Sequence, residues 1–374
     1  MAQSEAAREA RPTERWGGGR PPVCYGALDL GTNNCRLLIA TPDASAADGS
    51  GFHVVEAFSR IVRLGEGLSR TGRLDEGAMD RAVAALRVCA DKIRRRRALK
   101  VDAVATQACR AAENGAEFVA RVEQETGLQL RVITPQEEAR LSVAGCAALL
   151  DRSGEAAVVV DVGGGSTELS WVDLGRTRVE GRPHVLAWLS VPLGVVTLAE
   201  RFPEPTPAGE PWFRAMVEHV KGEIAKFSAA DPLKPHFAGG RAHLIGTSGA
   251  ITSLAGLHLG LRRYERSRVD GLWLTHADCR AAADRLIALD RKGRAAEPCI
   301  GPDRADLVLA GAAILQAVQE LWPCERVRVA DRGLREGLLM SLMAERRAGV
   351  GNERRRRRRS GGGRGPAAVH GDPR

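Results

Sequence analysis

Two glycine-rich turns, each opening with an aspartate, carry the clearest chemistry in this sequence. The first reads DLGTNN at residues 29–34, and the second reads DVGGGST at residues 161–167. Glycine lets the backbone approach an anion closely, and successive N–H groups can then form an anion-binding nest. A carboxylate repels a bare phosphate, so each aspartate is expected to hold a hard cation, typically Mg²⁺, that bridges carboxylate and phosphate oxygens. Two such turns favour a duplicated phosphate site over plain hairpin turns.

Other polar residues add to this chemistry. Glu168 follows Asp161 on the opposite arm of the same hairpin, so both side chains can reach the mouth of the turn. A third glycine turn, Gly246-Thr247-Ser248-Gly249, separates an apolar run from a helical pattern, where a helix N-terminus can assist anion binding. Arg110 can hold a phosphate through two hydrogen bonds, which lysine cannot do.

Two adjacent glutamates are candidates for the base that activates water. Thr134 and Pro135 predict the start of a helix, which places Glu137 and Glu138 in its first turn. A positioned carboxylate can accept the proton of an attacking water. The alternative interpretation is an acidic first turn that is favoured by the helix dipole.

The elements that must position these residues alternate between strands and helices. Strands are expected at 23–30, 35–40, 53–58, 101–106, 130–133, 157–161, 167–172, 185–191, 243–246 and 327–330. Helices are expected at 76–98, 112–126, 134–150, 193–201, 212–227, 251–259, 275–289, 304–321 and 334–344. This mixture predicts an α/β protein, and 374 residues suffice for two domains.

Composition narrows the function classes further. Aromatic residues make up only 4%, which argues against extensive stacking surfaces for single-stranded nucleic acid. The net charge of +9 arises mainly from a tail, since residues 354–374 hold eight arginines and one aspartate. The eight cysteines include no CxxC pair, and the chain shows neither a secretory signal nor a transmembrane run. We therefore expect a cytoplasmic protein that has no specific nucleic-acid or membrane partner.

Several motifs together resemble the exopolyphosphatase / guanosine pentaphosphate phosphohydrolase (Ppx/GppA phosphatase) family. They cover about residues 23–345 and read ALDLGTNNCRLLIA (27–40), ATQACRAAEN (105–114), TPQEEARL (134–141), VVVDVGGGSTELS (158–170), LIGTSGAITSLA (244–255) and GLREGLL (333–339). The resemblance implies two ribonuclease-H-like domains of the actin/Hsp70/sugar-kinase superfamily that meet at a cleft. The expected boundaries are a disordered segment at 1–22, domain I at 23–140, domain II at 141–345 and a disordered basic tail at 346–374. This corresponds to a short, two-domain form of the family.

The resemblance also assigns roles to individual residues. It implies Glu138 as the catalytic base, with Glu137 as the alternative, and Arg110 as a catalytic phosphate-binding arginine. The metal-associated acids are Asp161, Glu168 and, by symmetry, Asp29. The implied phosphate-binding residues are Gly31, Thr32, Asn33, Gly163, Gly164, Gly165, Ser166, Thr167, Gly246 and Ser248. Asn34 stands where the family commonly has a hydroxyl residue. Its amide still offers hydrogen-bond donors, so an altered contact is expected there and not a lost site.

The expected activity is Mg²⁺-dependent release of terminal phosphate from inorganic polyphosphate or guanosine pentaphosphate, by a homodimer. The sequence does not rank the two substrates, because both present a terminal phosphoanhydride to the same turns. Two alternatives are an ATP-using kinase or ATPase of the same superfamily and a non-catalytic sensor of guanosine tetraphosphate or polyphosphate. The acid of the EEAR motif at residues 137–140 and Arg110 argue against a kinase or ATPase. The complete set Glu138, Asp161 and Glu168 argues against a non-catalytic sensor.

Overall fold

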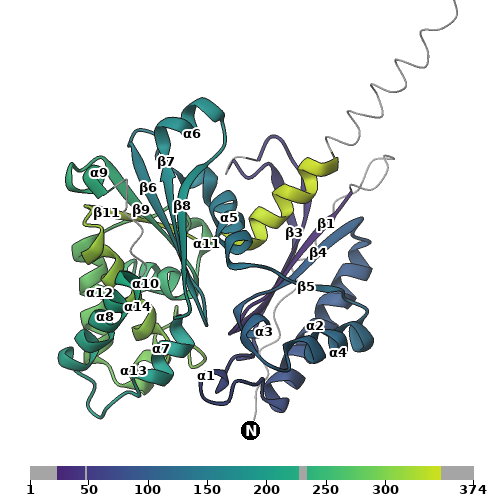
Figure 1. The fold of residues 1–374 in the computed structure, drawn as a ribbon, viewed down its shortest axis with the longest axis horizontal. Helices are drawn as coiled ribbons and strands as arrows, with labels where there is room; N and C mark the ends of the chain where they lie inside the picture. Colours follow the sequence, from purple (N-terminus) through teal and green to yellow (C-terminus); the bar gives the residue numbers. More distant parts are fainter. Residues whose placement is uncertain (1–22, 47–48, 227–233, 347–374) are drawn as a thin grey trace, which may run out of the picture.

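The computed structural model describes residues 23–46, 49–226 and 234–346. The expected disordered segment at 1–22 and the basic tail from residue 347 onward lie outside the described residues. Within them, two β-sheets stand on either side of a central gap that two helices cross (Figure 1). No helix of the described residues is long and apolar enough to cross a membrane.

The first sheet has five strands in the order β3-β2-β1-β4-β5. The strands are β1 (Tyr25–Leu30), β2 (Asn34–Pro42), β3 (Phe52–Ile61), β4 (Lys100–Ala105) and β5 (Leu130–Val132). β1 and β2 form the antiparallel hairpin that carries the first glycine turn, whereas β4 runs parallel to β1 and to β5. The parallel pairing brings the end of β4, and with it the segment containing Arg110, to the same sheet edge as the turn.

Helix α2 (Glu76–Arg96) shows how local sequence builds the layer over this sheet. The Asp75 side chain caps its N-terminus by accepting a hydrogen bond from the Ala78 amide. The buried side chains recur at three- and four-residue spacing, as in Ala82 and Leu86, and they pack into the core of the first sheet. Three arginines in the last turn suit the negative end of the helix dipole.

The second sheet repeats the first and adds an edge strand. Its order is β10-β11-β9-β6-β7-β8, from β6 (Ala156–Val162), β7 (Thr167–Asp173), β8 (His184–Val191), β9 (Ala242–Thr247), β10 (Trp273–Thr275) and β11 (Arg326–Ala330). β6, β7 and β8 pair antiparallel, and β9 lies parallel to β6 and β11, so β8-β7-β6-β9-β11 has the connectivity of the first sheet. This duplication confirms the expected pair of ribonuclease-H-like domains.

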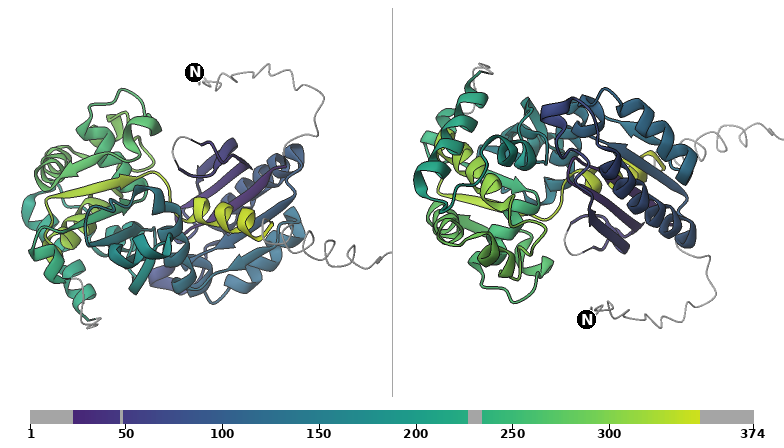
Figure 2. Two further views of the ribbon diagram at one scale, coloured as in Figure 1. Left: turned by 90° about the horizontal axis from the view of Figure 1, so that it is seen from above. Right: turned by 90° about the horizontal axis from the view of Figure 1, so that it is seen from below.

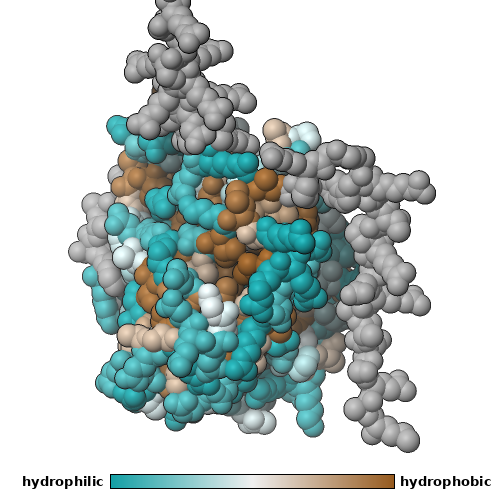
Figure 3. Space-filling model, turned by 90° about the vertical axis from the view of Figure 1, so that its right-hand side faces the viewer, coloured by the Kyte–Doolittle hydropathy of each residue, from teal (hydrophilic) through white to brown (hydrophobic). Residues whose placement is uncertain are grey.

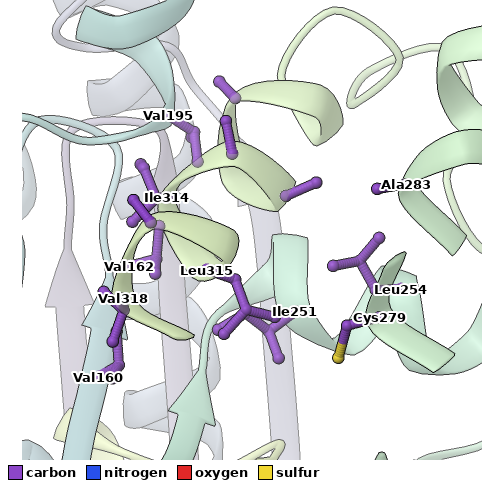
Figure 4. Close-up of a cluster of buried hydrophobic side chains, with 14 of the residues drawn as sticks. Val160, Val162, Val195, Ile251, Leu254, Cys279, Ala283, Ile314, Leu315 and Val318 are labelled. Atoms are coloured by element: carbon purple, nitrogen blue, oxygen red, sulfur yellow. The ribbon is translucent and has the colours of Figure 1, made fainter. Parts of the chain in front are cut away.

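The helices of the second half form a large apolar core against this sheet. Figure 4 shows part of that core, where Val160 and Val162 of β6 lie near Ile314 and Val318. The helices of this half are α6 (Leu174–Glu180), α7 (Val195–Arg201), α8 (Glu210–Ala225), α9 (Lys234–Ala238), α10 (Gly249–His258), α11 (Arg266–Val269), α12 (His276–Ala288), α13 (Arg291–Ala296) and α14 (Val308–Leu321). The sequence pattern did not predict α6, α9, α11, α13 or β10.

Two helices join the domains. Helix α5 (Pro135–Cys146) contacts β6, β7 and β8 of the second sheet, and it continues into the short 3-10 helix Ala147–Leu149. The last described helix, residues 334–346, belongs by sequence to the second expected domain. Its Leu338, Leu339 and Leu342 nevertheless pack in one cluster with residues of β1 and β2, and the two views in Figure 2 show it lying against the first domain. The chain therefore crosses between the domains twice.

The expected helix at 112–126 begins at Gly115 in the structure. A short helix α3 (Gln107–Ala111) precedes α4 (Gly115–Thr126). The Asn114 side chain lies between them, accepting from the Leu74 amide at 2.8 Å and donating to the Leu74 carbonyl at 3.1 Å. This pair of tertiary hydrogen bonds fixes the residue before α4, so the helix begins three residues later than expected. Besides α2, α3 and α4, the described part before α5 holds the short helix α1 (Leu68–Thr71).

Some large apolar side chains of the first domain are exposed to solvent. Figure 3 shows the flank of the molecule, where hydrophilic side chains border hydrophobic ones. Large apolar residues exposed in the described part include Leu99, at 62%, and Val132, at 41%. Single exposed residues of this kind are ordinary in soluble domains and indicate no particular partner.

Candidate active site

The two glycine turns lie directly against each other. A Cβ added to Gly164 would stand 3.0 Å from Thr32 Cβ and 3.1 Å from the Asn33 amide nitrogen. One added to Gly165 would stand 2.8 Å from Thr32 Oγ1. Side chains at these positions would push the turns apart, so glycine is what permits their contact. The duplicated motif therefore forms one site between the domains.

A cavity opens at this contact and is lined from both domains. Most residues expected at the site line it, namely Asp29, Gly31, Thr32, Asn33, Glu138, Asp161, Gly163, Gly164, Gly165, Ser166 and Ser248. Thr167, Glu168, Gly246 and Arg110 do not. The Thr167 hydroxyl donates to the Leu193 carbonyl at 2.7 Å, and Gly246 packs against the Ile251 side chain while its neighbour Thr247 lines the cavity. Asn34, where the sequence departs from the family, lines the cavity too.

Several carboxyl groups gather around the cavity, and Asp331 and Glu336 line it besides the expected acids. Asp161 and Glu168 are directly opposite each other in the β6–β7 register, and Asp29 and Glu138 belong to the same electrostatic group. Burial, with a smaller contribution from the charge of Asp161, raises the pKa of Asp29 to about 6 and that of Glu168 to about 7. Burial also raises the pKa of Asp161, against a hydrogen bond from Ser142 that lowers it. A cation at the cavity would relieve this concentration of negative charge.

Asp161 is partly buried at the end of β6, and Glu168 is only 2% exposed. The Ser142 hydroxyl donates to Asp161 Oδ2, and the Ser190 hydroxyl donates to Glu168 Oε1 at 2.8 Å. Both carboxylates are therefore oriented by neighbouring hydroxyl groups, and neither projects freely into solvent.

The adjacent glutamates of α5 have different surroundings. Thr134 caps the helix by accepting from the Glu137 amide at 3.2 Å. The Glu137 carboxylate faces outward to Arg131, with both oxygens 2.8 Å from Arg131 Nη1. Glu138 lines the cavity, is 8% exposed, and lies 3.3 Å from the Arg110 guanidinium. Burial and the charge of Glu168 hold the pKa of Glu138 well above its ordinary value, which suits a group that must accept a proton.

Arg110 is fixed by protein partners. Its guanidinium donates to the Ile133 carbonyl at 2.6 Å and to Gln107 Oε1 at 2.7 Å, besides contacting Glu138. Its side chain is part-buried and does not line the cavity. In this arrangement Arg110 orients Glu138 and ties α5 to the first domain.

The oxygen donors suit a hard cation such as Mg²⁺. Within the described ranges, no three His, Cys, Asp or Glu side chains form a ready-made metal site. Mg²⁺ usually binds through one or two carboxylates and completes its shell with water and substrate phosphate. The buried carboxylates Asp161 and Glu168, together with Asp29, supply the donor type that this mode needs.

Arginines that the sequence analysis did not single out line the other part of the cavity. Arg36, Arg304 and Arg335 all contribute. Burial lowers the pKa of Arg36, and the neighbouring charges of Arg335 and Arg304 lower it further. A Cβ at Gly249, at the start of α10, would stand 3.5 Å from Arg36 Nη2 and 3.8 Å from Arg304 Cζ, so a helix N-terminus joins this positive region.

A signal for Arg36 was present in the sequence. It stands two residues after Asn34 on β2, and strand alternation places these two side chains on one face. The register also sets Arg36 opposite Asp29. Arg304 had no such local signal, because it lies in the turns before α14 and reaches the cavity only through tertiary packing.

Backbone strain also marks this site. Ser248, the N-cap of α10, has φ 142°, a conformation that side chains other than glycine rarely adopt. Its hydroxyl accepts from the Ile251 amide at 3.4 Å. The strained turn lies at the start of α10, beside Arg36 and Arg304.

Two duplicated α/β domains, with facing phosphate-type turns and an acidic centre between them, define the class of protein expected from the sequence, a pair of ribonuclease-H-like domains that meet at one site. Within that class, the model of the Ppx/GppA phosphatase family matches residues 44–346. The chain belongs to this family, and the coarse activity that follows is that of a phosphatase.

Individual relatives agree with this assignment. The chain is 32% identical to exopolyphosphatase 2 of Mycobacterium tuberculosis over 325 aligned residues. The alignment covers 84% of this chain and 97% of that protein. The crystal structure of a Ppx/GppA family member from Aquifex aeolicus is 30% identical, has a TM-score of 0.70, and covers 87% of this chain and 99% of that one. An exopolyphosphatase structure from Cytophaga hutchinsonii has a TM-score of 0.74 at 24% identity, covers 86% of this chain and 98% of that one, and supports the fold.

Proposed function

We propose that the protein is a Mg²⁺-dependent phosphohydrolase that releases terminal phosphate from inorganic polyphosphate, with guanosine pentaphosphate as the second candidate substrate. The observation that carries this proposal is the cavity in which the two glycine turns meet beside Glu138. The similarity to a protein named as an exopolyphosphatase supports polyphosphate as the substrate.

In the proposed reaction the terminal phosphate lies between the turns. Backbone amides of Gly164, Gly165 and Ser166 donate to its oxygens, while Arg36 and Arg304 neutralise phosphates farther along the chain. Mg²⁺, when bound by Asp161 with Glu168 and Asp29, neutralises charge on the phosphate oxygens.

Glu138 provides the general-base step. It accepts a proton from a water molecule as the water oxygen forms a bond to the terminal phosphorus. The bridging P–O bond breaks, and its electron pair remains on the shortened chain. Such a reaction depends mainly on positioning and on neutralising charge, and a buried base beside two anion-binding turns provides both.

Phosphate release measured with polyphosphate, guanosine pentaphosphate and ATP, each with Mg²⁺ and with excess chelator, tests the proposal. We expect release from polyphosphate, guanosine pentaphosphate or both, lost with the chelator. Turnover of ATP alone would favour the kinase or ATPase alternative. Binding of these anions without any release would favour the sensor.

A further inference from the structure

A serine on helix α5 links the proposed base to the proposed metal-binding acid. Ser142 follows Glu138 by four residues, so both side chains lie on the same face of α5, one turn apart. Ser142 is 1% exposed, and its hydroxyl donates to Asp161 Oδ2. Glu138 and Asp161 belong to different elements, α5 and β6, and this hydrogen bond joins those elements at the cavity.

The helix that carries Ser142 is held rigidly. A Cβ at Gly145 would stand 1.9 Å from the Gly333 carbonyl oxygen, and one at Gly337 would stand 2.1 Å from the Leu141 carbonyl oxygen. The backbones of α5 and of the helix at 334–346 therefore touch on both sides of Ser142. In such close packing α5 cannot shift to restore a lost contact.

The orientation of Asp161 needs a partner of this kind. Glu168 faces Asp161 in the sheet register, and the negative charges of Asp29 and Glu138 are close. The charge of Arg36 also acts on Asp161, so a second, directional contact is needed to hold the carboxylate in one orientation. A hydrogen bond to Oδ2 fixes the carboxylate plane and leaves Oδ1 available to a ligand. Groups that orient a metal ligand in this way typically change metal affinity by about 10–100-fold when removed.

We propose that Ser142 is a positioning residue, which orients Asp161 toward the bound cation and fixes its place relative to Glu138. The inference rests on the proposed function, since it takes Asp161 as a cation ligand. It assigns the hydroxyl of Ser142 a role in cation affinity, distinct from filling space between α5 and the sheet.

The test compares Ser142→Ala with Ser170→Ala on the full chain. Ser170 is a matched control, because it is also a buried serine, at 2% exposure, two residues beyond Glu168 on β7, and no hydrogen bond joins it to a carboxylate in the described part. Mn²⁺ binding without substrate, followed by electron paramagnetic resonance, should weaken about 10–100-fold in Ser142→Ala and stay unchanged in Ser170→Ala. In phosphate-release assays the half-saturating Mg²⁺ concentration should rise, with kcat recovering at high Mg²⁺.

A double-mutant cycle identifies the path of the effect. If Ser142 acts through Asp161, Ser142→Ala should cause no further loss of Mn²⁺ affinity in an Asp161→Asn background. Additive losses would overturn the inference, as would unchanged Mn²⁺ affinity in the single variant. Should Ser142→Ala fail to fold, Ser142→Cys keeps similar volume with a weaker donor, and the same weakening of binding is expected.

The metal-binding measurement separates this inference from the proposed activity. A wild-type protein that binds Mn²⁺ but releases no phosphate from either substrate would reject the hydrolase while leaving the Ser142 comparison decisive. A wild-type protein that binds no Mn²⁺ would overturn the inference itself.

Discussion

At the scale of single residues, two neighbouring glutamates illustrate how a helix separates a structural role from a catalytic one. Successive residues of an α-helix point about 100° apart. Glu137 consequently faces Arg131 at the surface, whereas Glu138 faces the cavity beside Arg110. The sequence motif presented both as candidates, and this difference in surroundings favours Glu138.

We predict that Glu138→Gln lowers kcat about 10²–10⁴-fold while changing KM little, because the amide keeps the shape but cannot accept a proton from water. Glu137→Gln is the control and should retain nearly full turnover. Steady-state phosphate release from polyphosphate measures both. If only Glu137→Gln is inactive, the base is Glu137 and the assignment to Glu138 is wrong by one residue. If neither variant loses more than a few-fold, the water is activated without either glutamate.

Asp29 gives a prediction about pH. Its pKa is about 6 in the fold, against 3.8 in the unfolded chain, so the folded state binds the proton more tightly. The contribution of Asp29 to the free energy of unfolding is therefore largest below about pH 4 and falls as pH rises through about 6. The wild-type minus Asp29→Asn difference in unfolding free energy should decrease over this range, measured by urea unfolding with a chelator present. A difference that stays constant or grows with pH would contradict the burial of a neutral Asp29.

At the scale of elements, the segment between β3 and α1 binds both domains. The amides of Val62 and Arg63 donate to the Asn33 carbonyl at 2.9 and 3.1 Å, which anchors the first glycine turn. The Arg63 guanidinium donates to both oxygens of Asp306 in the second domain, at 2.9 and 3.1 Å. Glu200 of α7 accepts from the Gly67 amide at 2.7 Å. These contacts bridge the two domains and place the first turn.

We predict that Glu200→Ala combined with Asp306→Ala raises KM about tenfold and lowers kcat less. Without these contacts the two domains spend more time apart, and substrate binding must first bring them together. A tenfold change corresponds to about 1.4 kcal/mol, a reasonable sum for two half-buried polar bridges. Steady-state kinetics and small-angle X-ray scattering would follow the change. Asp91→Ala, which removes an exposed ion pair with Arg94 within α2, should alter neither measurement. Equal KM values in the double variant and the wild type would show that the bridges do not control closure.

At the scale of the whole molecule, the arginine tail remains a prediction from sequence. Residues 354–359 are six consecutive arginines, outside the described residues. Deleting residues 351–374 should leave turnover of short substrates unchanged and weaken the apparent affinity for long polyphosphate at low salt. Exposed charges act over about 10 Å at 0.1 M salt, so the difference should disappear as salt increases. Replacing the six arginines by glutamine is the matched variant, and an identical salt dependence in all three proteins would leave the tail without a role in binding. The homodimer and the cytoplasmic location likewise stay predictions.

The sequence by itself determined the features that depend on near neighbours in the chain. The glycine turns, the Asp75 and Thr134 caps and the apolar spacing of α2 follow from residues within a few positions of one another. Duplicated hairpins and α/β alternation therefore indicated an α/β protein with a duplicated phosphate site, and the motif resemblance implied the two ribonuclease-H-like domains and most of the cavity residues. The motif-based resemblance separated Glu138 from Glu137 only by spacing.

Only the tertiary structure decided which distant residues share the cavity and which element lies on which sheet. Arg304 reaches the arginine region from beyond α13, the helix at 334–346 returns to the first sheet, and Asn114 binds Leu74 at the residue before α4. None of these contacts produces a periodic pattern in the sequence, because each depends on how two surfaces far apart in the chain pack together. The hydrogen bond from Ser142 to Asp161 is of the same kind, since it exists only where α5 lies across β6.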